Sequence, residues 1–320
     1  MRILIFGGGA VGLGIASCLI KSGTEVDIIA RPDTARALSE VGLERVGIFG
    51  AFSAAPGSFR CYSTIGDLTE TRYDYILVCT KAHDSMDAAR DLSSNPSFLE
   101  GEAKIVLFQN GWGGAEIFSS FFPKERVFNA RVITGFVRPE KNRVEVTVHA
   151  DAIRVGSLFS GPVDDLADLC AAIAGGGIPC EPTEEIGRDL WAKMLYNCAL
   201  NALGAIFEVP YGVLGEWEYT REIMKLIIEE VYLVMDRSGH ATHWESPGDY
   251  LAVFYEKLLP PTAKHDSSML QDIRAKKGTE IDFLNGAVVT LGRQVNSPTP
   301  INLTVYNMMK FLETRAVSGK

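Results

Sequence analysis

The sequence feature that most constrains the fold is a glycine-rich segment that follows a short apolar run at the start of the chain. Residues 2–6 (RILIF) suit one buried strand, and they lead directly into Gly7-Gly8-Gly9-Ala10-Val11-Gly12, a G-x-G-x-x-G pattern. Residues 13–21 then have a helical pattern, and residues 24–30 (TEVDIIA) predict a second strand. The segment therefore predicts a complete strand-loop-helix-strand unit.

Three glycines of this loop have separate physical reasons. Gly7 allows a tight turn after the strand, Gly9 lets the backbone approach a pyrophosphate without an intervening Cβ, and Gly12 lets the helix pack closely on the strand. The free N–H groups at the helix start would face the phosphates, which the positive end of the helix dipole also favours. Residues 7–12 therefore predict dinucleotide binding, and a glycine-rich turn that binds no ligand is the alternative.

The residue after the second strand distinguishes between two cofactors. An Asp or Glu there would bind the ribose 2′-OH of NAD, whereas this chain has Arg31. Asp27 lies earlier, at a buried position of the strand pattern, and Asp33 follows Pro32. Because a planar guanidinium matches the oxygens of a 2′-phosphate, we predict NADP (NADPH) rather than NAD. The alternative for Arg31 is an ordinary surface cation.

Composition limits the classes of protein to which the chain can belong. Its 320 residues are too many for one typical hydrophobic core and are sufficient for two domains. The formal net charge of −9 argues against nucleic acid or an anionic membrane as a main partner. An anionic cofactor must then be held by local cations and helix ends, because the overall field of the protein repels it.

The first residues and the cysteines indicate a compartment. The chain enters a strand directly, so we expect no signal peptide, and no apolar run approaches the roughly 20 residues of a membrane span. None of the six cysteines forms a C-x-x-C pair, and several lie in apolar patterns: Cys18, Cys61, Cys79, Cys170, Cys180 and Cys198. This usage suits a reducing compartment, and we predict a cytoplasmic protein.

Strand and helix patterns alternate through the first half of the chain. Buried strands are expected at 75–80 and 103–108, each followed by a helix, and antiparallel partners at 127–137 and 144–155. This alternation predicts a Rossmann-type, doubly wound α/β domain over residues 1–184. Ligands of such sheets bind at the carboxyl ends of the strands, where this chain places the polar residues Arg31, Lys81, Gln109 and Asn110.

After Glu184 the patterns become helical. Helices are expected at 186–203, 219–238, 249–258, 280–293 and 303–314, with Pro and Gly between them. We therefore predict an all-helical domain over residues 185–320, with a substrate cleft between the two domains. A helix that starts at Gly278 or Thr279 would place Glu280 in its first turn, where the helix dipole favours an acid.

The first of these helices carries a polar stripe. Lys193, Asn197 and Asn201 are spaced i, i+4 and i+8, so they share one face of an otherwise apolar helix. Two Asn residues in such surroundings are costly unless they find partners. The stripe suits a small anionic substrate, and a solvated helix edge with each Asn bonded to a neighbouring backbone is the alternative.

Taken together, these motifs resemble those of the ketopantoate reductase (2-dehydropantoate 2-reductase) family, nearly from end to end. They are G-G-G-A-V-G at 7–12, T-K-A at 80–82, Q-N-G at 109–111, L-W-x-K-x-x-x-N-x-x-x-N at 190–201 and S-S-M-L-Q-D-I-R-A with T-E-I-D at 267–282. The last two are distinctive of the family, whereas many dehydrogenases share the first.

The resemblance implies an activity and a set of roles. The family reduces the 2-keto group of ketopantoate to pantoate with NADPH, a step towards pantothenate and coenzyme A. Lys193 would be the general acid, and Glu280 would orient it and hold the substrate hydroxyl or the nicotinamide ribose. Asn197, Asn201 and Ser268 would bind the substrate. The cofactor would be bound by Gly7, Gly8, Gly9, Ala10, Val11, Gly12, Arg31, Lys81 and Asn110.

The proposed roles agree with the chemistry. Hydride that arrives at a keto carbon leaves negative charge on the oxygen, which a nearby ammonium stabilises and then protonates. A lysine beside a carboxylate stays protonated. Asn and Ser side chains suit the carboxylate or hydroxyl of a short hydroxy-keto acid.

Two departures from the family pattern leave alternatives open. His83 and Asp84 stand where an aromatic residue and Gln are common, and Pro210 is followed by Tyr211 rather than by Asn. The substrate could therefore be another 2-keto acid, or Tyr211 could replace the missing donor. A non-catalytic NADP-binding sensor is the alternative from another class. The histidines have no metal spacing, so we predict no metal, and the helical domain could form a homodimer.

Overall fold

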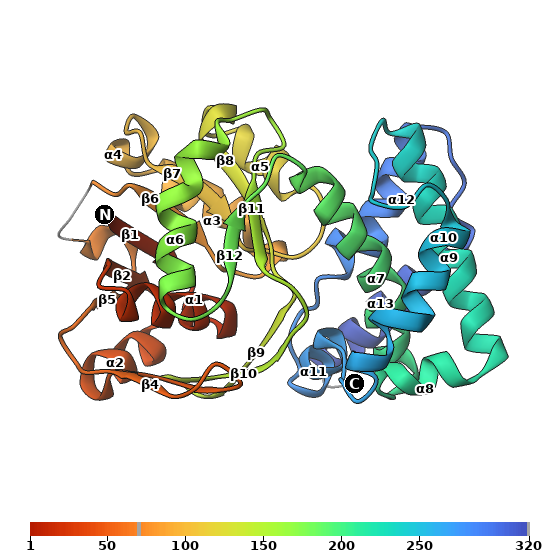
Figure 1. Cartoon of the computed structure of the whole chain (residues 1–320), viewed down its shortest axis with the longest axis horizontal. Coiled ribbons are helices and arrows are strands. Elements are labelled where there is room, and N and C mark those ends of the chain that lie inside the picture. The colour runs from red at the N-terminus through yellow and green to blue at the C-terminus, as the bar shows by residue number, and fades with distance from the viewer. Residues whose placement is uncertain (69–71, 319–320) are drawn as a thin grey trace. The chain divides into compact units, whose positions relative to one another are not determined.

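The computed structural model describes residues 1–68 and 72–318 (Figure 1). The chain divides into two compact units. The first contains residues 1–109 and 114–186, and the second contains residues 110–113 and 187–320. The border predicted at 184–185 lies near the end of the first unit at Ile186. Residues 110–113 belong to the second unit although the flanking residues belong to the first.

An eight-stranded sheet forms the centre of the first unit, in the order β12-β11-β8-β7-β6-β1-β2-β5. Neighbouring strands from β8 to β5 are parallel, and β11 pairs antiparallel with β8. The strands are β1 (Arg2–Phe6), β2 (Glu25–Ile29), β5 (Arg60–Tyr62), β6 (Tyr75–Val78), β7 (Lys104–Leu107), β8 (Val127–Arg131), β11 (Ile153–Gly156) and β12 (Cys180–Pro182).

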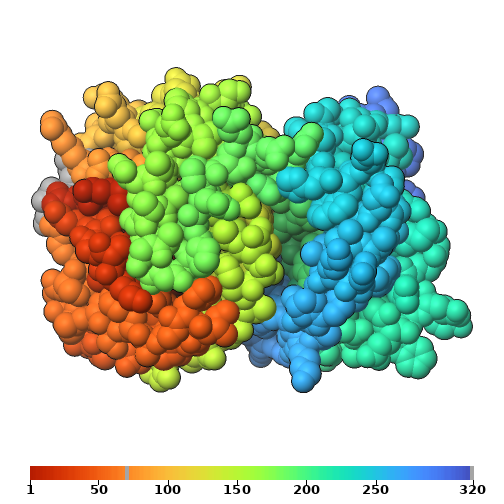
Figure 2. All heavy atoms as spheres, viewed as in Figure 1, coloured from red at the N-terminus to blue at the C-terminus, as the bar shows by residue number. Residues whose placement is uncertain are grey.

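Helices cover both faces of this sheet, because successive side chains of a strand point to opposite faces. Ile3 and Ile5 pack with α1 (Ala10–Lys21) and α6 (Ala167–Gly175) on one face. In Figure 2 the segment that contains α6, in light green, lies at the surface of this unit. Leu4 and Phe6 pack on the other face with α3 (Ser85–Ser93), α4 (Pro96–Leu99) and α5 (Gly114–Ser119). The doubly wound α/β fold predicted for this half is confirmed.

A second, four-stranded sheet lies beside α1, in the order β4-β3-β10-β9. Its strands are β3 (Leu43–Gly47), β4 (Phe52–Ala54), β9 (Thr134–Glu140) and β10 (Arg143–His149). The expected antiparallel pairing is confirmed for β9 with β10 and for β8 with β11. However, each of the two expected strands is divided into two. One part, β8 or β11, joins the main sheet, and the other, β9 or β10, joins the small sheet. Val144 and Val146 of β10 bury the side of α1 that the main sheet leaves uncovered.

The second unit is helical, as predicted. Its helices are α7 (Ile186–Phe207), α8 (Tyr211–Glu216), α9 (Glu218–Arg237), α10 (Pro247–Val253), α11 (Ser268–Arg274), α12 (Asn285–Gln294) and α13 (Pro300–Ser318). The first unit also contains the ten-residue helix α2 (Pro32–Val41). Short helical turns of the described residues are η1 (Ile65–Asp67), η2 (Ala82–Asp84), η3 (Lys124–Arg126), η4 (Val163–Leu166), η5 (Phe254–Leu258), η6 (Pro260–Thr262) and η7 (Ile281–Phe283). The sequence patterns did not predict α8 or α11.

The helix expected at 280–293 starts later than predicted. Glu280 precedes the 3-10 turn η7, and α12 begins only at Asn285. The reason is the backbone of Leu284 (φ −110°, ψ −105°), which lies outside the helical region and separates the two segments. The interpretation of Glu280 as an acid in the first turn of a long helix is therefore wrong.

A buried polar network fixes α7 within the second unit. Glu230 of α9 accepts hydrogen bonds from the backbone N–H groups of Ile301 and Asn302, which lie at the start of α13. Asn302 accepts from Asn285 of α12, whose side chain also donates to the carbonyl of Cys198 in α7 at 3.1 Å.

Among the described residues, no helix is long and apolar enough to cross a membrane.

Candidate functional site

The glycine loop of the first unit connects β1 to α1. Gly7 has φ +120°, and a Cβ at this residue would lie 2.8 Å from the backbone of Cys79 and Thr80. A Cβ at Gly12 would lie 2.0 Å from the Gly7 carbonyl oxygen, so only glycine permits this approach. At Gly9 the nearest atom to such a Cβ is the Cys79 oxygen at 3.8 Å. The loop is therefore tightly packed against the protein at Gly7 and Gly12, whereas Gly9 has space beside it.

The start of α1 is suited to an anion. Gly9 is the N-cap residue and supplies no side-chain cap, and the first turn contains no acidic residue. The N–H groups of this turn therefore receive no hydrogen bond acceptor from a cap side chain, and the helix dipole adds partial positive charge. These are the properties expected of a loop that binds a pyrophosphate.

Gln109 holds the loop that contains Lys81. Its Nε2 donates to Thr80 Oγ1 at 3.1 Å and to the Lys81 carbonyl at 3.2 Å, and its Oε1 accepts from Ser85 Oγ at 3.0 Å. Because β6 and β7 are adjacent and parallel, their carboxyl ends meet at one edge, as the sequence predicted. His83 and Asp84 lie in η2 after this loop, with 3.6 Å between His83 Nε2 and Asp84 Oδ1.

Asp27 is buried and engaged in a structural network. It is 1% exposed, and its carboxylate accepts from Arg60 Nε at 2.7 Å and from the Tyr73 hydroxyl at 2.7 Å. Burial and this hydrogen bond raise the pKa of Tyr73. The Asp27 carboxylate is thus bonded to Arg60 of the neighbouring strand β5, whereas Arg31, which follows β2, is exposed.

In the second unit, Asn110 lies between the two residues to which the resemblance gave catalytic roles. Lys193 Nζ donates to Asn110 Oδ1 at 2.6 Å, and Asn110 Nδ2 donates to Glu280 Oε2 at 2.9 Å. Glu280 is 4% exposed. Asn110 thereby joins Lys193, 83 positions away, and Glu280, 170 positions away, in one hydrogen-bonded group. The resemblance assigned Asn110 to the cofactor, and its bonds here are to the residues of the second unit.

The segment that carries Asn110 is fixed by aromatic packing. The backbone N–H of Trp112 donates to the Phe283 carbonyl at 2.9 Å. The Trp112 ring lies 4.8 Å from that of Trp191, and the His240 ring lies 4.7 Å from that of Trp112. Burial lowers the pKa of His240, which favours its neutral form. This cluster fixes the position of Asn110 relative to Lys193.

The polar stripe of α7 continues from Lys193 into the unit. Asn197 is 8% exposed and Asn201 is 5% exposed. No partner of the Asn197 side chain is found in the part of the chain that the structure describes. The Tyr211 hydroxyl donates to Asn201 Oδ1 at 2.5 Å, so Asn201 is not bonded to a neighbouring backbone, contrary to the alternative above. Buried amide groups are normally hydrogen-bonded, so the Asn197 amide and the Asn201 Nδ2 group are candidates for binding a polar ligand.

Ser267 and Ser268 have different environments at the start of α11. Ser267 Oγ donates to the Asn201 carbonyl at 2.9 Å and caps α11 by accepting from the Leu270 N–H at 3.0 Å. Ser268, the residue given a substrate role by the resemblance, is partly exposed as the first residue of the helix. Sequence reasoning missed Ser267, although Ser before an apolar run is a recognisable N-cap signal.

Tyr211, which the sequence suggested as a replacement for the missing donor, is buried beside Asn201. Its ring is 4% exposed, and burial raises the pKa of its hydroxyl. The ring lies 5.9 Å from that of Tyr196 and 5.4 Å from that of His265. The only sequence signal was its position after Pro210, where the family commonly has Asn.

Comparison with known proteins assigns the chain to a family. Residues 3–158 match the ketopantoate reductase PanE/ApbA family, and residues 185–313 match the C-terminal family of ketopantoate reductase PanE/ApbA. The chain belongs to the ketopantoate reductase family. It is 33% identical to 2-dehydropantoate 2-reductase of Aquifex aeolicus over 98% of this chain and 97% of that protein. The same enzyme of Vibrio cholerae is 30% identical over 98% of both chains.

Solved structures agree with the ketopantoate reductase fold. A PanE/ApbA family ketopantoate reductase from Ralstonia eutropha JMP134 is 27% identical, with a TM-score of 0.84 over 99% of both chains. D-mandelate dehydrogenase with NADH and anilino(oxo)acetate is 22% identical, with a TM-score of 0.87 over 99% of both chains. At that identity the likeness shows the fold alone. The family inferred from the sequence motifs is confirmed, and its members are nicotinamide-dependent reductases.

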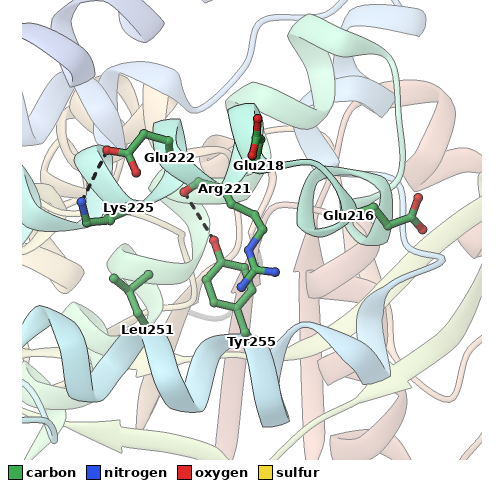
Figure 3. A pocket seen from close by; sticks show the side chains of 7 residues that line it. All are labelled: Glu216, Glu218, Arg221, Glu222, Lys225, Leu251 and Tyr255. Atoms are coloured by element: carbon green, nitrogen blue, oxygen red, sulfur yellow. Dashed lines mark hydrogen bonds and ion pairs between the residues drawn. The ribbon is translucent and has the colours of Figure 1, made fainter.

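A further hollow of the second unit does not involve the residues described above. It has a volume of about 390 Å³, and Figure 3 shows the Arg221 guanidinium stacked on the Tyr255 ring inside it, 4.2 Å from the ring centre. Its other lining residues are Glu216, Glu218, Glu222, Lys225 and Leu251.

Within the described ranges no group of three or more His, Cys, Asp or Glu residues is placed to hold a metal ion.

Proposed function

We propose that this protein reduces 2-dehydropantoate to pantoate with NADPH as the hydride donor. The observation that carries the proposal is the group formed by Lys193, Asn110 and Glu280 at the head of the amide stripe of α7. A cation bonded to the Asn110 amide, which is itself bonded to the Glu280 carboxylate, followed by two buried amides, matches the polar groups of a short hydroxy-keto acid.

The glycine loop supports binding of NADPH to the first unit. The space beside Gly9 and the absence of a side-chain cap on α1 provide N–H donors for a pyrophosphate. Arg31 would bind the 2′-phosphate, and the loop of Lys81, held by Gln109, would border the cofactor. Once bound, NADPH supplies hydride to the keto carbon.

The residues of the second unit would then handle the developing charge. Negative charge on the former keto oxygen is stabilised by the Lys193 ammonium, which donates its proton to give the alcohol. Asn110 Oδ1 fixes the direction of Nζ, and Glu280 fixes the amide of Asn110 in turn. The Nδ2 group of Asn201 donates to an oxygen of the substrate, because its Oδ1 is bonded to Tyr211.

Tyr211 favours a second candidate, which is reduction of a 2-keto acid with a different side chain. Its hydroxyl proton is used in the bond to Asn201, so it does not reproduce the donor that Asn would supply to a substrate hydroxyl. D-mandelate dehydrogenase shares the fold, so the fold also accommodates a different 2-hydroxy acid. Relative kcat/KM values distinguish the two candidates.

The substitution Lys193→Ala tests whether the protein is an enzyme or a cofactor-binding sensor. We expect turnover to fall by roughly 10²–10⁴-fold, the usual contribution of a general acid, with NADPH binding retained. Lys225→Ala is the control, because it removes a lysine of the same unit that pairs with Glu222 outside this site. Turnover that survives in the Lys193 variant would contradict the proposed role.

Two further aspects belong to this proposal. We place the reaction in the cytoplasm, since the six cysteines are free thiols. We also propose a homodimer formed through the helical unit, where Trp217 and Tyr219 are 61% and 74% exposed. Light scattering of the purified protein measures the molar mass, and a monomer at all accessible concentrations would exclude the dimer.

A further inference from the structure

A second arginine lies beside the position at which the sequence predicted only Arg31. Arg138 belongs to β9, more than one hundred positions from the start of α2. Its Nη1 donates to the Gly8 carbonyl at 2.8 Å and lies 3.3 Å from Thr34 Oγ1. The guanidinium therefore connects the glycine loop with the first turn of α2.

Backbone contacts place this guanidinium close to the residue that ends β2. A Cβ on Gly8 would lie 2.5 Å from the Cβ of Ala30, so the loop packs directly against the residue before Arg31. The N–H of Thr34 donates to the Arg31 carbonyl at 2.8 Å. Arg138 thus bonds to Gly8, which packs against the residue before Arg31, and to Thr34, whose N–H bonds to the Arg31 carbonyl. This is the end of the strand where a dinucleotide-binding fold recognises the adenosine ribose.

The charges at this junction are unbalanced. Burial lowers the pKa of Arg138, and the positive charge of Arg31 lowers it further. No carboxylate pairs with Arg138 among residues 1–68 and 72–318, whereas most other arginines of this unit have an acidic partner. Two like charges in a partly buried site destabilise the empty protein, and a bound dianion would relieve the repulsion.

We propose that Arg138 and Arg31 together bind the 2′-phosphate of NADPH, and that Arg138 is a residue that determines the preference for NADPH over NADH. This inference rests on the proposed use of NADPH. Arg138 Nη1 is occupied by the protein, while Nε and Nη2 have no partner among the described residues and are available to phosphate oxygens. The bond to Gly8 also links the phosphate site to the pyrophosphate loop.

Calorimetric titration with 2′,5′-ADP and with 5′-AMP tests the proposal without turnover. We expect wild type to bind 2′,5′-ADP more tightly, and Arg138→Met to weaken its binding by about tenfold or more. Binding of 5′-AMP should change by less than about twofold, because it lacks the 2′-phosphate. Arg138→Lys, which keeps the charge, should recover part of the loss.

Arg143→Met is the matched control. Arg143 begins β10 of the same small sheet, and its guanidinium lies 3.7 Å from Glu44 and 3.9 Å from Glu140. Its removal changes the net charge equally and should leave both affinities unchanged. A melting temperature near that of wild type verifies that each variant is folded.

Three results would overturn the inference. Equal loss of both ligands in Arg138→Met would mean that Arg138 only supports the glycine loop. An unchanged affinity for 2′,5′-ADP would exclude it from the site. A wild-type protein that does not distinguish the ligands would refute the NADPH preference as well. Failure to reduce ketopantoate would appear only in turnover assays and leave these titrations unaffected.

Discussion

Removing one hydroxyl group tests whether Tyr211 orients the amide of Asn201. In Tyr211→Phe the hydrogen bond of 2.5 Å to Asn201 Oδ1 is lost, and a carbonyl oxygen on a residue that is 5% exposed is left without its partner. A neutral hydrogen bond contributes about 1 kcal/mol, and an unsatisfied buried group costs about 1–3 kcal/mol. We therefore expect the free energy of unfolding to fall by roughly 1.5–3 kcal/mol.

The same substitution should affect substrate binding. Without Tyr211 to hold Oδ1, the amide of Asn201 can rotate, and its Nδ2 no longer faces the substrate in every molecule. A loss of about 1.4 kcal/mol corresponds to a tenfold change in affinity, so we expect KM for the 2-keto acid to rise about tenfold. The turnover number and NADPH binding should change little, because Lys193 and the glycine loop are untouched. Steady-state kinetics measures both parameters.

Tyr196→Phe provides the control for this experiment. Its hydroxyl is also partly buried, bonded to Thr262 Oγ1 at 2.5 Å, and its ring lies 5.9 Å from that of Tyr211. Burial raises the pKa of Tyr196 to about 12, so both phenols are neutral at pH 7. This variant should lose stability without a rise in KM. An equal rise in KM in both variants, or none in Tyr211→Phe, would refute the reasoning.

Three more perturbations test the glycine loop, Asn110 and His240. Gly9→Ala should melt near wild type, because the new Cβ meets only the Cys79 oxygen at 3.8 Å, yet weaken NADPH binding by about tenfold in a fluorescence titration. Asn110→Ala should lower kcat by roughly tenfold to a hundredfold with NADPH affinity retained; a loss of affinity instead would assign Asn110 to the cofactor. Because the pKa of His240 is lowered in the folded state, the unfolded state binds its proton more readily, so the free energy of unfolding should decrease as pH falls below about 6.5. Urea denaturation at several pH values should show a shallower dependence for His240→Phe, and identical slopes would exclude His240 as the source.

Local patterns were sufficient to predict the strands and helices that bury one continuous face. The apolar run of β1 followed by this glycine pattern is typical of a dinucleotide-binding fold, so a short segment was enough to predict the fold of the first unit. The same patterns did not reveal that residues 127–137 change sheets at Val132 and Ile133. Both halves of that segment are apolar, and only the exposed side of α1 determines which sheet each half completes.

The candidate site residues were harder to predict, because their partners are distant in sequence. Nothing near Asn110 indicates that its amide bonds to Lys193 and Glu280 rather than remaining with Gln109, whose side chain holds the Lys81 loop. Tyr211 lies in a six-residue helix that is too short for a hydrophobic period. Arg138 had no signal at all, since an arginine in an edge strand is usually solvated.

The most direct test of the central claim is steady-state oxidation of NADPH with ketopantoate, beside pyruvate, 2-ketoisovalerate and other branched 2-keto acids, repeated with NADH. We predict that ketopantoate gives a kcat/KM at least about tenfold above the other acids, and that NADPH exceeds NADH by a similar factor. Ketopantoate that is inert while another 2-keto acid turns over would contradict the assignment, and Tyr211 would then be the first residue to test for a different substrate.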